Sequence, residues 1–322
     1  MSVSLFAPPV LIEAEPYAAL PDELRMPSKI ASGFAEGQPP GSALTSVLEG
    51  PSFDRDGNLW CVDIPNGRVL RLDTERQFHL VCEYDGWPNG LKIHRDGRIF
   101  IADHKHGIML LDPVNGRIEP YLVRANLERF KAVNDLFFAS NGDLYFTDQG
   151  LTGLHDPSGR VFQLRPDGAV TCLIDNVPSP NGLVMNLDES ALYVAATRGN
   201  CIWRIPLLSN GTTAKVGLFI QLSGGGGPDG IALNTDGGLV VAHIGLGCVW
   251  VFDKAGQPRY RVQSRTGLHT TNVAFGGANG AELFITESET GTILRAKLDT
   301  PGKAMYSHAR DCVACADIGQ SQ

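Results

Sequence analysis

The chain has 322 residues, with 27 Lys or Arg against 35 Asp or Glu, which gives a formal net charge of -8. A chain of this length forms either two ordinary domains or one large all-β domain. Its charges are spread without runs of one sign, which excludes the basic stripe of a typical nucleic-acid binder. No stretch of about 18 apolar residues is present, so we expect no transmembrane helix and no membrane partner.

The N-terminus and the cysteines both indicate a cytoplasmic protein. The first residues include Glu13 and Glu15 and lack the basic n-region of a signal peptide. The seven cysteines form an odd set without framework spacing, which favours reduced thiols. Cys312 and Cys315 make a lone CxxC pair near the C-terminus, where no strand-helix pattern supports a redox motif.

A repeated unit predicts the architecture. Each unit has a small polar motif, an apolar strand, a turn and a second strand, as in NGLKIHRDGRIFIAD. The six copies begin at Glu49, Asn89, Asn134, Asn181, Asp229 and Asn272, with spacings of 40, 45, 47, 48 and 43 residues. A period in the forties with a β-hairpin in every unit is typical of a four-stranded propeller blade. The sequence therefore predicts an all-β, six-bladed β-propeller over residues 47–300.

The turns and the two ends of the chain complete this prediction. Asx-Gly pairs at 56–57, 96–97, 141–142 and 236–237 are expected to connect the first two strands of their blades. The calcium-loop interpretation of DRDGN (54–58) is set aside, because the same pattern recurs as a hairpin turn. Residues 1–46 form an N-terminal extension that is expected to lend a ring-closing strand from within 15–46, since closure removes an exposed sheet edge. Residues 301–322 form a C-terminal tail.

The first residue of each unit is a candidate site residue. In a propeller the innermost strands line a central channel, so the six starting side chains are expected to converge at one mouth. All six are carboxylates or carboxamides, which are the oxygen ligands that hard divalent cations prefer. Asn and Asp before Gly also serve as ordinary turn residues, although this explains Glu49 poorly. Two carboxylates, Glu49 and Asp229, would balance a 2+ charge, and amide oxygens of Asn134 and Asn181 would complete four protein ligands. Calcium is favoured, with magnesium, manganese, ferrous iron and zinc left open.

The runs LEGPSFD, AVNDLFFASNGDLYFTD, SPNGL, GPDGIALNTDGGL and TNVAFGG resemble the regucalcin/gluconolactonase family over about residues 45–298. The resemblance implies a six-bladed propeller with one divalent metal ion in the channel. It implies ligands at Glu49, Asn134, Asn181 and Asp229, and it implies hydrolysis of lactones, commonly of sugar acids. One departure is Ala132, which stands where the regucalcin branch has an Arg that helps hold the substrate.

Further polar residues are candidates for substrate contact. A second set ends the second strand of each unit, about 14 residues after its first residue, at Asp63, Asp103, Asp148, Thr197, His243 and Glu287. From this set and the ring we expect substrate binding by Asn89, Asp103, His104, Asp148 and Asn272. Hydrogen bonding within the blade ends is the alternative for the strand-end residues. The loop 150–159 is long enough to form a lid.

The predicted function is metal-dependent hydrolysis of a small polar lactone. The metal would polarise the carbonyl, and Asp229 would activate water, with a metal-bound hydroxide as the alternative base. No GxSxG motif indicates a serine nucleophile. Two alternatives stay open: hydrolysis of aryl esters or organophosphates at the same metal site, and a non-catalytic calcium-binding or protein-interaction propeller. The sequence leaves the oligomeric state open.

Overall fold

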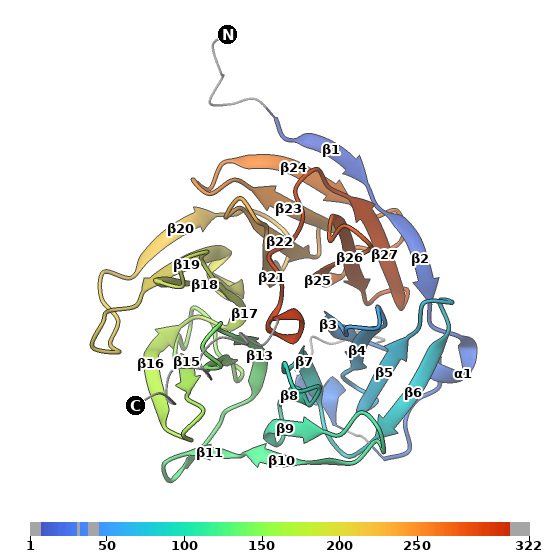
Figure 1. Ribbon diagram of the computed structural model, residues 1–322, viewed down its shortest axis with the longest axis horizontal. Coiled ribbons are helices and arrows are strands. Elements are labelled where there is room, and N and C mark those ends of the chain that lie inside the picture. Colours follow the sequence, from blue (N-terminus) through green and yellow to red (C-terminus); the bar gives the residue numbers. More distant parts are fainter. Residues whose placement is uncertain (1–7, 31–32, 38–44, 310–322) are drawn as a thin grey trace, which may run out of the picture.

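The computed structural model describes residues 8–30, 33–37 and 45–309 (Figure 1). Six twisted sheets surround a central axis in sequence order, from the blue blade near the N-terminus to the red blade near the C-terminus. The prediction of an all-β, six-bladed propeller is confirmed. Cys312 and Cys315 lie outside the described residues.

The first three blades are regular antiparallel sheets. Blade 1 contains β3 (Leu48–Phe53), β4 (Leu59–Asp63), β5 (Arg68–Leu72) and β6 (Phe78–Glu83). Blade 2 contains β7 (Pro88–Ile93), β8 (Ile99–Asp103), β9 (Gly107–Leu111) and β10 (Ile118–Leu122). Blade 3 contains β13 (Val133–Phe138), β14 (Leu144–Asp148), β15 (Gly159–Leu164) and β16 (Val170–Val177). A two-stranded hairpin, β11 (Arg124–Ala125) and β12 (Glu128–Arg129), lies between blades 2 and 3 in the sequence.

The last three blades follow the same order from the axis outward. Blade 4 contains β17 (Pro180–Met185), β18 (Ala191–Ala196), β19 (Cys201–Pro206) and β20 (Gly217–Gln221). Blade 5 contains β21 (Gly227–Leu233), β22 (Leu239–Ile244), β23 (Cys248–Phe252) and β24 (Pro258–Gln263). Blade 6 contributes β25 (Thr270–Gly276), β26 (Glu282–Glu287) and β27 (Thr292–Lys297) from its own part of the chain. In the described residues the helical elements are α1 (Asp22–Arg25) and the 3-10 turns Phe34–Gly37, Thr197–Gly199 and Tyr306–His308.

The N-terminal strands lie on the outer edges of the last two blades (Figure 1). β2 (Glu15–Ala19) pairs antiparallel with β27 as the fourth strand of blade 6. β1 (Val10–Glu13) pairs parallel with β24 as a fifth strand of blade 5. Both contacts join residues near the start of the chain to residues beyond position 250, so they close the ring and cover two sheet edges.

Burial follows from blades packing face to face. The second strands are completely enclosed, as in β8 and β14, because both of their faces meet neighbouring blades. Phe146 on β14 is fully buried and stacks on Phe162 with 5.2 Å between ring centroids. The outermost strands are half exposed, as in β10. The core is therefore distributed between the blades, which leaves the axis free as a channel.

Two local features of the inner strands position the site. The predicted Asx-Gly turns have glycines with positive φ, such as 85° at Gly57 and 92° at Gly97, which a side chain rarely adopts. At its other end, each inner strand shifts register against the second strand, for example between Glu49 and Ser52 and between Pro228 and Ile231. Such a bulge redirects side chains at the start of the strand. It occurs in all six blades, which turns the same positions toward the axis.

The cysteines and the helices of the described residues bear on disulfide bonds and on membrane crossing. Five cysteines lie in these ranges, and all five are free thiols. Across the described chain, no helix has the length and apolar character needed to cross a membrane.

Candidate active site in the central channel

The six inner strands form a closed ring around the axis. Each inner strand contacts the next, and β25 returns to β3. The six starting residues, predicted from the repeat, are all 2% to 7% exposed. Glycine directly follows four of these residues, and its lack of a side chain lets neighbouring inner strands lie close together. A Cβ atom at Gly182, for example, would lie 2.5 Å from the carbonyl oxygen of Asp229 in the next blade.

Glu49 is held in this ring by hydrogen bonds. Its Oε2 accepts from the backbone N–H of Gly50 and from Nδ2 of Asn272, both at 2.8 Å. Burial, together with the nearby charge of Asp135, raises the pKa of Glu49 to about 8. The ionised form is thus disfavoured unless a positive charge is added beside it.

Asp229 lies in a similar environment on β21. Burial raises its pKa well above the usual range, and the charges of Glu49 and Asp135 add to this effect. The guanidinium of Arg198 and a hydrogen bond from Asn181 act in the opposite direction. Two carboxylates that repel each other in a buried ring are therefore stabilised in their charged forms by a bound cation.

Asn134 carries the clearest sign of a missing partner. Its Nδ2 donates to Oε1 of Gln149 at 3.0 Å, but its buried Oδ1 has no hydrogen-bond partner within the described chain. Buried acceptors are rarely left unsatisfied, because the lost solvation costs about 1–3 kcal/mol. An oxygen of this kind, in a ring that also contains two buried carboxylates, fits a cation ligand. The residues present thus fit the divalent ion that the sequence predicted.

The donor set is restricted to oxygen. No three His, Cys, Asp or Glu side chains in the described ranges are grouped so that they could hold a metal ion by themselves. Cation binding would depend on the amide oxygens of Asn134 and Asn181 in addition to the two carboxylates. This composition favours a hard cation such as calcium or magnesium over a soft one.

Asn272 and Asn89 have partners that refine their expected roles. The amide of Asn272 is used on both sides, because its Nδ2 donates to Glu49 and its Oδ1 accepts from the N–H of Val273 at 2.8 Å. Asn272 therefore orients Glu49. Asn89 contacts Nε2 of His104 through its Nδ2 at 2.9 Å. Burial lowers the pKa of His104 to about 4, so this imidazole is neutral near pH 7.

Asp103 and Asp148 are held by hydrogen bonds at the ends of their blades, and their role in substrate binding stays a prediction. Both are completely buried. Asp103 accepts from the hydroxyl of Tyr84 at 2.8 Å and from two backbone N–H groups of its own turn. Asp148 pairs with Arg160 at 2.6 Å and accepts from the N–H of Ala132. Their oxygens hold the blade ends together, which was the alternative interpretation.

Asp135 is a channel residue that the sequence interpretation missed. It is 3% exposed, and its Oδ2 lies 3.4 Å from Nδ2 of Asn272. Strict alternation along β13 would place it opposite Asn134, but the bulge at the start of the strand brings both toward the axis. The available signal was its place in the repeat, where four other blades have glycine.

The loop 150–159 lies next to this mouth, as its chain position requires. Gln149, which precedes it, connects Asn134 to Oγ of Ser179. Lys131 donates to Ser158 through its Nζ, so it fastens the loop and does not replace the missing Arg at Ala132. Leu151 and Leu154 on this loop are 83% and 73% exposed.

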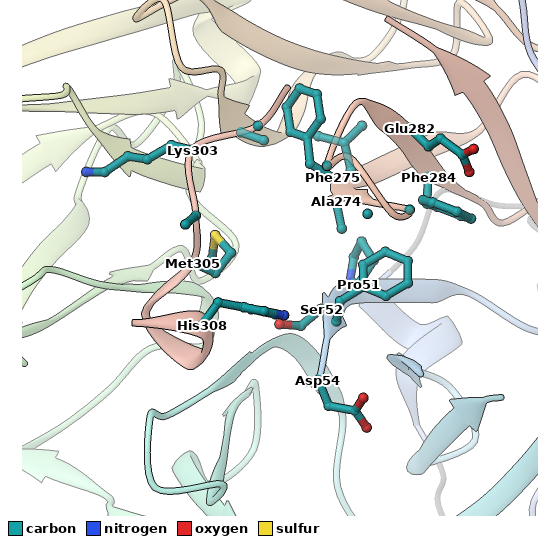
Figure 2. Close-up of a pocket in the computed structure, with 18 of the residues that line it drawn as sticks. Pro51, Ser52, Asp54, Ala274, Phe275, Glu282, Phe284, Lys303, Met305 and His308 are labelled. Atoms are coloured by element: carbon teal, nitrogen blue, oxygen red, sulfur yellow. The ribbon is translucent and has the colours of Figure 1, made fainter. Parts of the chain in front are cut away.

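The opposite end of the channel is a separate space. A cavity of about 650 Å³ extends from the middle of the inner strands to the hairpin turns. The C-terminal segment after β27 crosses toward the axis at this end (Figure 1). Figure 2 shows His308 extending from this segment toward Ser52, with Phe275 and Phe284 on the same wall. The carboxylate-amide ring and this cavity thus occupy different levels of one channel.

Residues 47–289 match the protein family described as SMP-30/Gluconolactonase/LRE-like region. The chain belongs to this family. The resemblance to the regucalcin/gluconolactonase family is thereby confirmed, and the match covers all six inner strands.

This SMP-30/gluconolactonase-family chain has relatives that are named lactonases. Lactonase drp35 of Staphylococcus haemolyticus is 34% identical over 223 residues, which cover 66% of this chain and 67% of the relative. Lactonase drp35 of Staphylococcus aureus strain MRSA252 is 34% identical over 226 residues, covering 66% and 68%.

Solved structures show the same fold at lower identity. A gluconolactonase from Xanthomonas campestris has a TM-score of 0.70 at 23% identity, covering 92% of this chain and 98% of that one. A calcium-binding regucalcin from Agrobacterium tumefaciens has a TM-score of 0.72 at 21% identity, with the same coverage.

Proposed function

We propose that this chain opens a small polar lactone of the sugar-acid type, with one divalent cation held in the central channel. Its family and its lactonase relatives make it a lactone-hydrolysing enzyme. The cation, the substrate and the residue roles are the proposed parts. The observation that carries them is that one ring of inner-strand residues contains the buried carboxylates Glu49 and Asp229 and the unpartnered Oδ1 of Asn134.

Glu49, Asn134, Asn181 and Asp229 would hold the cation, and Asn272 would fix the orientation of Glu49. When bound, the cation supplies Lewis acidity toward the lactone carbonyl. Calcium is our first choice because every proposed donor is a hard oxygen.

Asp229 is the proposed general base. Its carboxylate accepts a proton from the attacking water, whose oxygen bonds to the carbonyl carbon. The ring C–O bond then breaks, and the proton passes from Asp229 to the released oxygen, which leaves a hydroxyl and a carboxylic acid. The acid then ionises and releases the second proton of the water to solvent. Cation binding lowers the proton affinity of Asp229, but burial and the charges of Glu49 and Asp135 raise it. These opposing effects keep a ligating carboxylate basic enough to act.

Asn89 and neutral His104 supply further hydrogen-bonding groups for substrate hydroxyls. The pair is already connected at 2.9 Å, so a hydroxyl bound by one side chain is oriented by the other. A site with several amide groups discriminates strongly against analogues that lack hydroxyls, since its own polar groups would then stay unpaired.

The test is lactone hydrolysis by chelator-treated protein before and after addition of Ca²⁺, Mg²⁺, Mn²⁺, Zn²⁺ or Fe²⁺. A panel of aldonolactones is followed by acid release. Asp229→Asn keeps the size of the side chain and should lose at least about 100-fold in kcat, the range for a general base. Asp175→Asn on the exposed edge of β16 is the matched control and should be unaffected. Cation binding without turnover on any lactone would instead support the non-catalytic propeller.

One observation favours a second substrate class. Leu151 and Leu154 present apolar side chains on the loop that follows Gln149, beside the ring. An aromatic lactone or aryl ester would bury them, at about 25 cal/mol per Å² of apolar surface. Serine at both positions should lower kcat/KM for such substrates about threefold to tenfold and leave aldonolactones unchanged. Leu127→Ser, on the hairpin between blades 2 and 3 and 93% exposed, is the control.

A further inference from the structure

At two positions of the repeat, one blade has a charged residue where the other five blades have uncharged residues. Directly after each ring residue stand Gly50, Gly90, Asp135, Gly182, Gly230 and Val273. Three positions after each ring residue stand Ser52, Lys92, Phe137, Val184, Ala232 and Phe275. Each set contains one charged residue, and these two lie on adjacent blades. All six residues of the second set line the cavity on the far side of the ring.

The two exceptions face each other. Nζ of Lys92 lies 3.8 Å from Oδ1 of Asp135, and it donates to the carbonyl oxygen of Leu91 at 3.1 Å. Lys92 is 8% exposed and Asp135 is 3% exposed. Gly90 makes room for the pair, because a Cβ atom there would lie 2.5 Å from Oδ1 of Asp135. A buried charge is costly unless an opposite charge lies close to it, and Lys92 and Asp135 compensate each other in the channel in this way.

The pair is electrostatically connected to the ring. Asp135 approaches Nδ2 of Asn272, which also holds Glu49. Glu49, Asp135 and Asp229 would contribute three negative charges when ionised, and Lys92 contributes one positive charge. This cluster of four buried side chains then has a formal charge of 2-, which matches a divalent ion. Arg198, whose charge also acts on Asp229, is exposed to solvent and is not counted among them.

We propose that Lys92 is a positioning residue that sets the charge of the channel site, and thereby its selectivity for divalent over trivalent cations. Asp135 alone would leave a cluster charge of 3-, which favours a trivalent ion. Lys92 offsets that charge from the cavity side, without occupying a place among the proposed ligands. This inference rests on the proposed cation site and concerns binding, not turnover.

The test measures the affinities of Ca²⁺ and La³⁺ separately by isothermal titration calorimetry, in the same buffer, with metal-stripped protein. In Lys92→Met the ratio of La³⁺ affinity to Ca²⁺ affinity should rise at least about tenfold, since one unit of nearby charge acts more strongly on the 3+ ion. Lys92→Arg keeps the charge and should keep the wild-type ratio. The double variant Lys92→Met, Asp135→Asn restores a cluster charge of 2- and should return the ratio to the wild-type value.

The outcomes separate this inference from the proposed function. If the wild-type protein binds neither cation, the proposed metal-dependent function fails and this inference falls with it. If the wild-type protein binds Ca²⁺ but the ratio is the same in Lys92→Met, the proposed function stands and the inference is overturned. An increase in Lys92→Met that persists in the double variant also overturns it, because the cause would then be altered packing and not charge. If Lys92→Met does not fold, Lys92→Gln takes its place in the same comparison.

Discussion

Nδ2 of Asn272 donates to Oε2 of Glu49 at 2.8 Å, across a sequence separation of 223 residues. The bond connects the first inner strand of the propeller to the last. It therefore ties the geometry of the proposed cation ligand to closure of the ring. A change at either residue should affect both stability and the site.

Asn272→Ala removes this bond and leaves Glu49 with one donor, the N–H of Gly50. We expect the free energy of unfolding to fall by about 1–3 kcal/mol, the cost of an unsatisfied buried partner. We also expect Ca²⁺ affinity to fall, because Glu49 loses its fixed orientation. Urea unfolding and calorimetry measure the two effects. Asn176→Ala on the exposed edge of β16 is the control, and equal behaviour of the two variants would contradict a positioning role.

Cation binding should release protons near neutral pH. In the metal-free protein the pKa of Glu49 is raised to about 8, so at pH 7 this carboxyl group keeps its proton. A cation must displace that proton, so affinity should increase with pH through about 8. Titration calorimetry at pH 7 in two buffers of different ionisation enthalpy measures the proton release, which should be smaller in Glu49→Gln, where Asp229 is the remaining ligand with a raised pKa.

The same raised pKa has a consequence for the stability of the metal-free protein. The folded state binds the Glu49 proton more tightly than the unfolded chain, whose carboxyl has a pKa near 4.5. This contribution is fully present below about pH 4.5 and is lost as the pH rises through about 8. Metal-free protein should therefore unfold more easily at pH 9 than at pH 6, and saturating Ca²⁺ should remove most of the difference. Thermal unfolding at both pH values gives the comparison, and a metal-free protein that is more stable at pH 9 would contradict it.

The ring could be predicted from the sequence because every blade repeats its position at the start of the inner strand, and four blades repeat the Asx-Gly turn that follows this strand. The contacts of Asp103 and Asp148 could not be predicted, since a strand-end carboxylate can point to the channel or into its own blade. The hydrogen bond from Arg160, twelve residues after Asp148, directs the Asp148 carboxylate into its own blade. Asp135 was missed because a bulge, which has no sequence signature of its own, overrides the alternation of side chains along the strand.

Asn134→Ala should separate stability from cation binding. It removes a hydrogen bond to Gln149, but it also removes a buried oxygen that has no partner in the described chain. These effects offset each other, so the unfolding free energy of the metal-free protein should change by less than about 1 kcal/mol. Ca²⁺ affinity should fall at least about tenfold, because a ligand oxygen is lost. Gln149→Ala keeps the oxygen and serves as the control. Unchanged affinity in Asn134→Ala would remove Asn134 from the proposed ligand set.

The glycines that directly follow ring residues, such as Gly182, should not tolerate a side chain. A Cβ atom at Gly182 would lie 2.5 Å from the carbonyl oxygen of Asp229 and 2.7 Å from the N–H nitrogen of Ile231. Both contacts are with backbone, so the neighbouring inner strand must move and Asp229 must move with it. We expect Gly182→Ala to lower the unfolding free energy by about 1–3 kcal/mol, as for overpacked cores, and to reduce kcat/KM for the lactone. Gly217 on β20 is the matched control, because no atom lies within 4 Å of a Cβ atom there. Gly217→Ala should be neutral or stabilising by up to about 1 kcal/mol, since alanine restricts the unfolded chain. Equal stability and activity of the two variants would show that the inner strands can separate without disturbing Asp229.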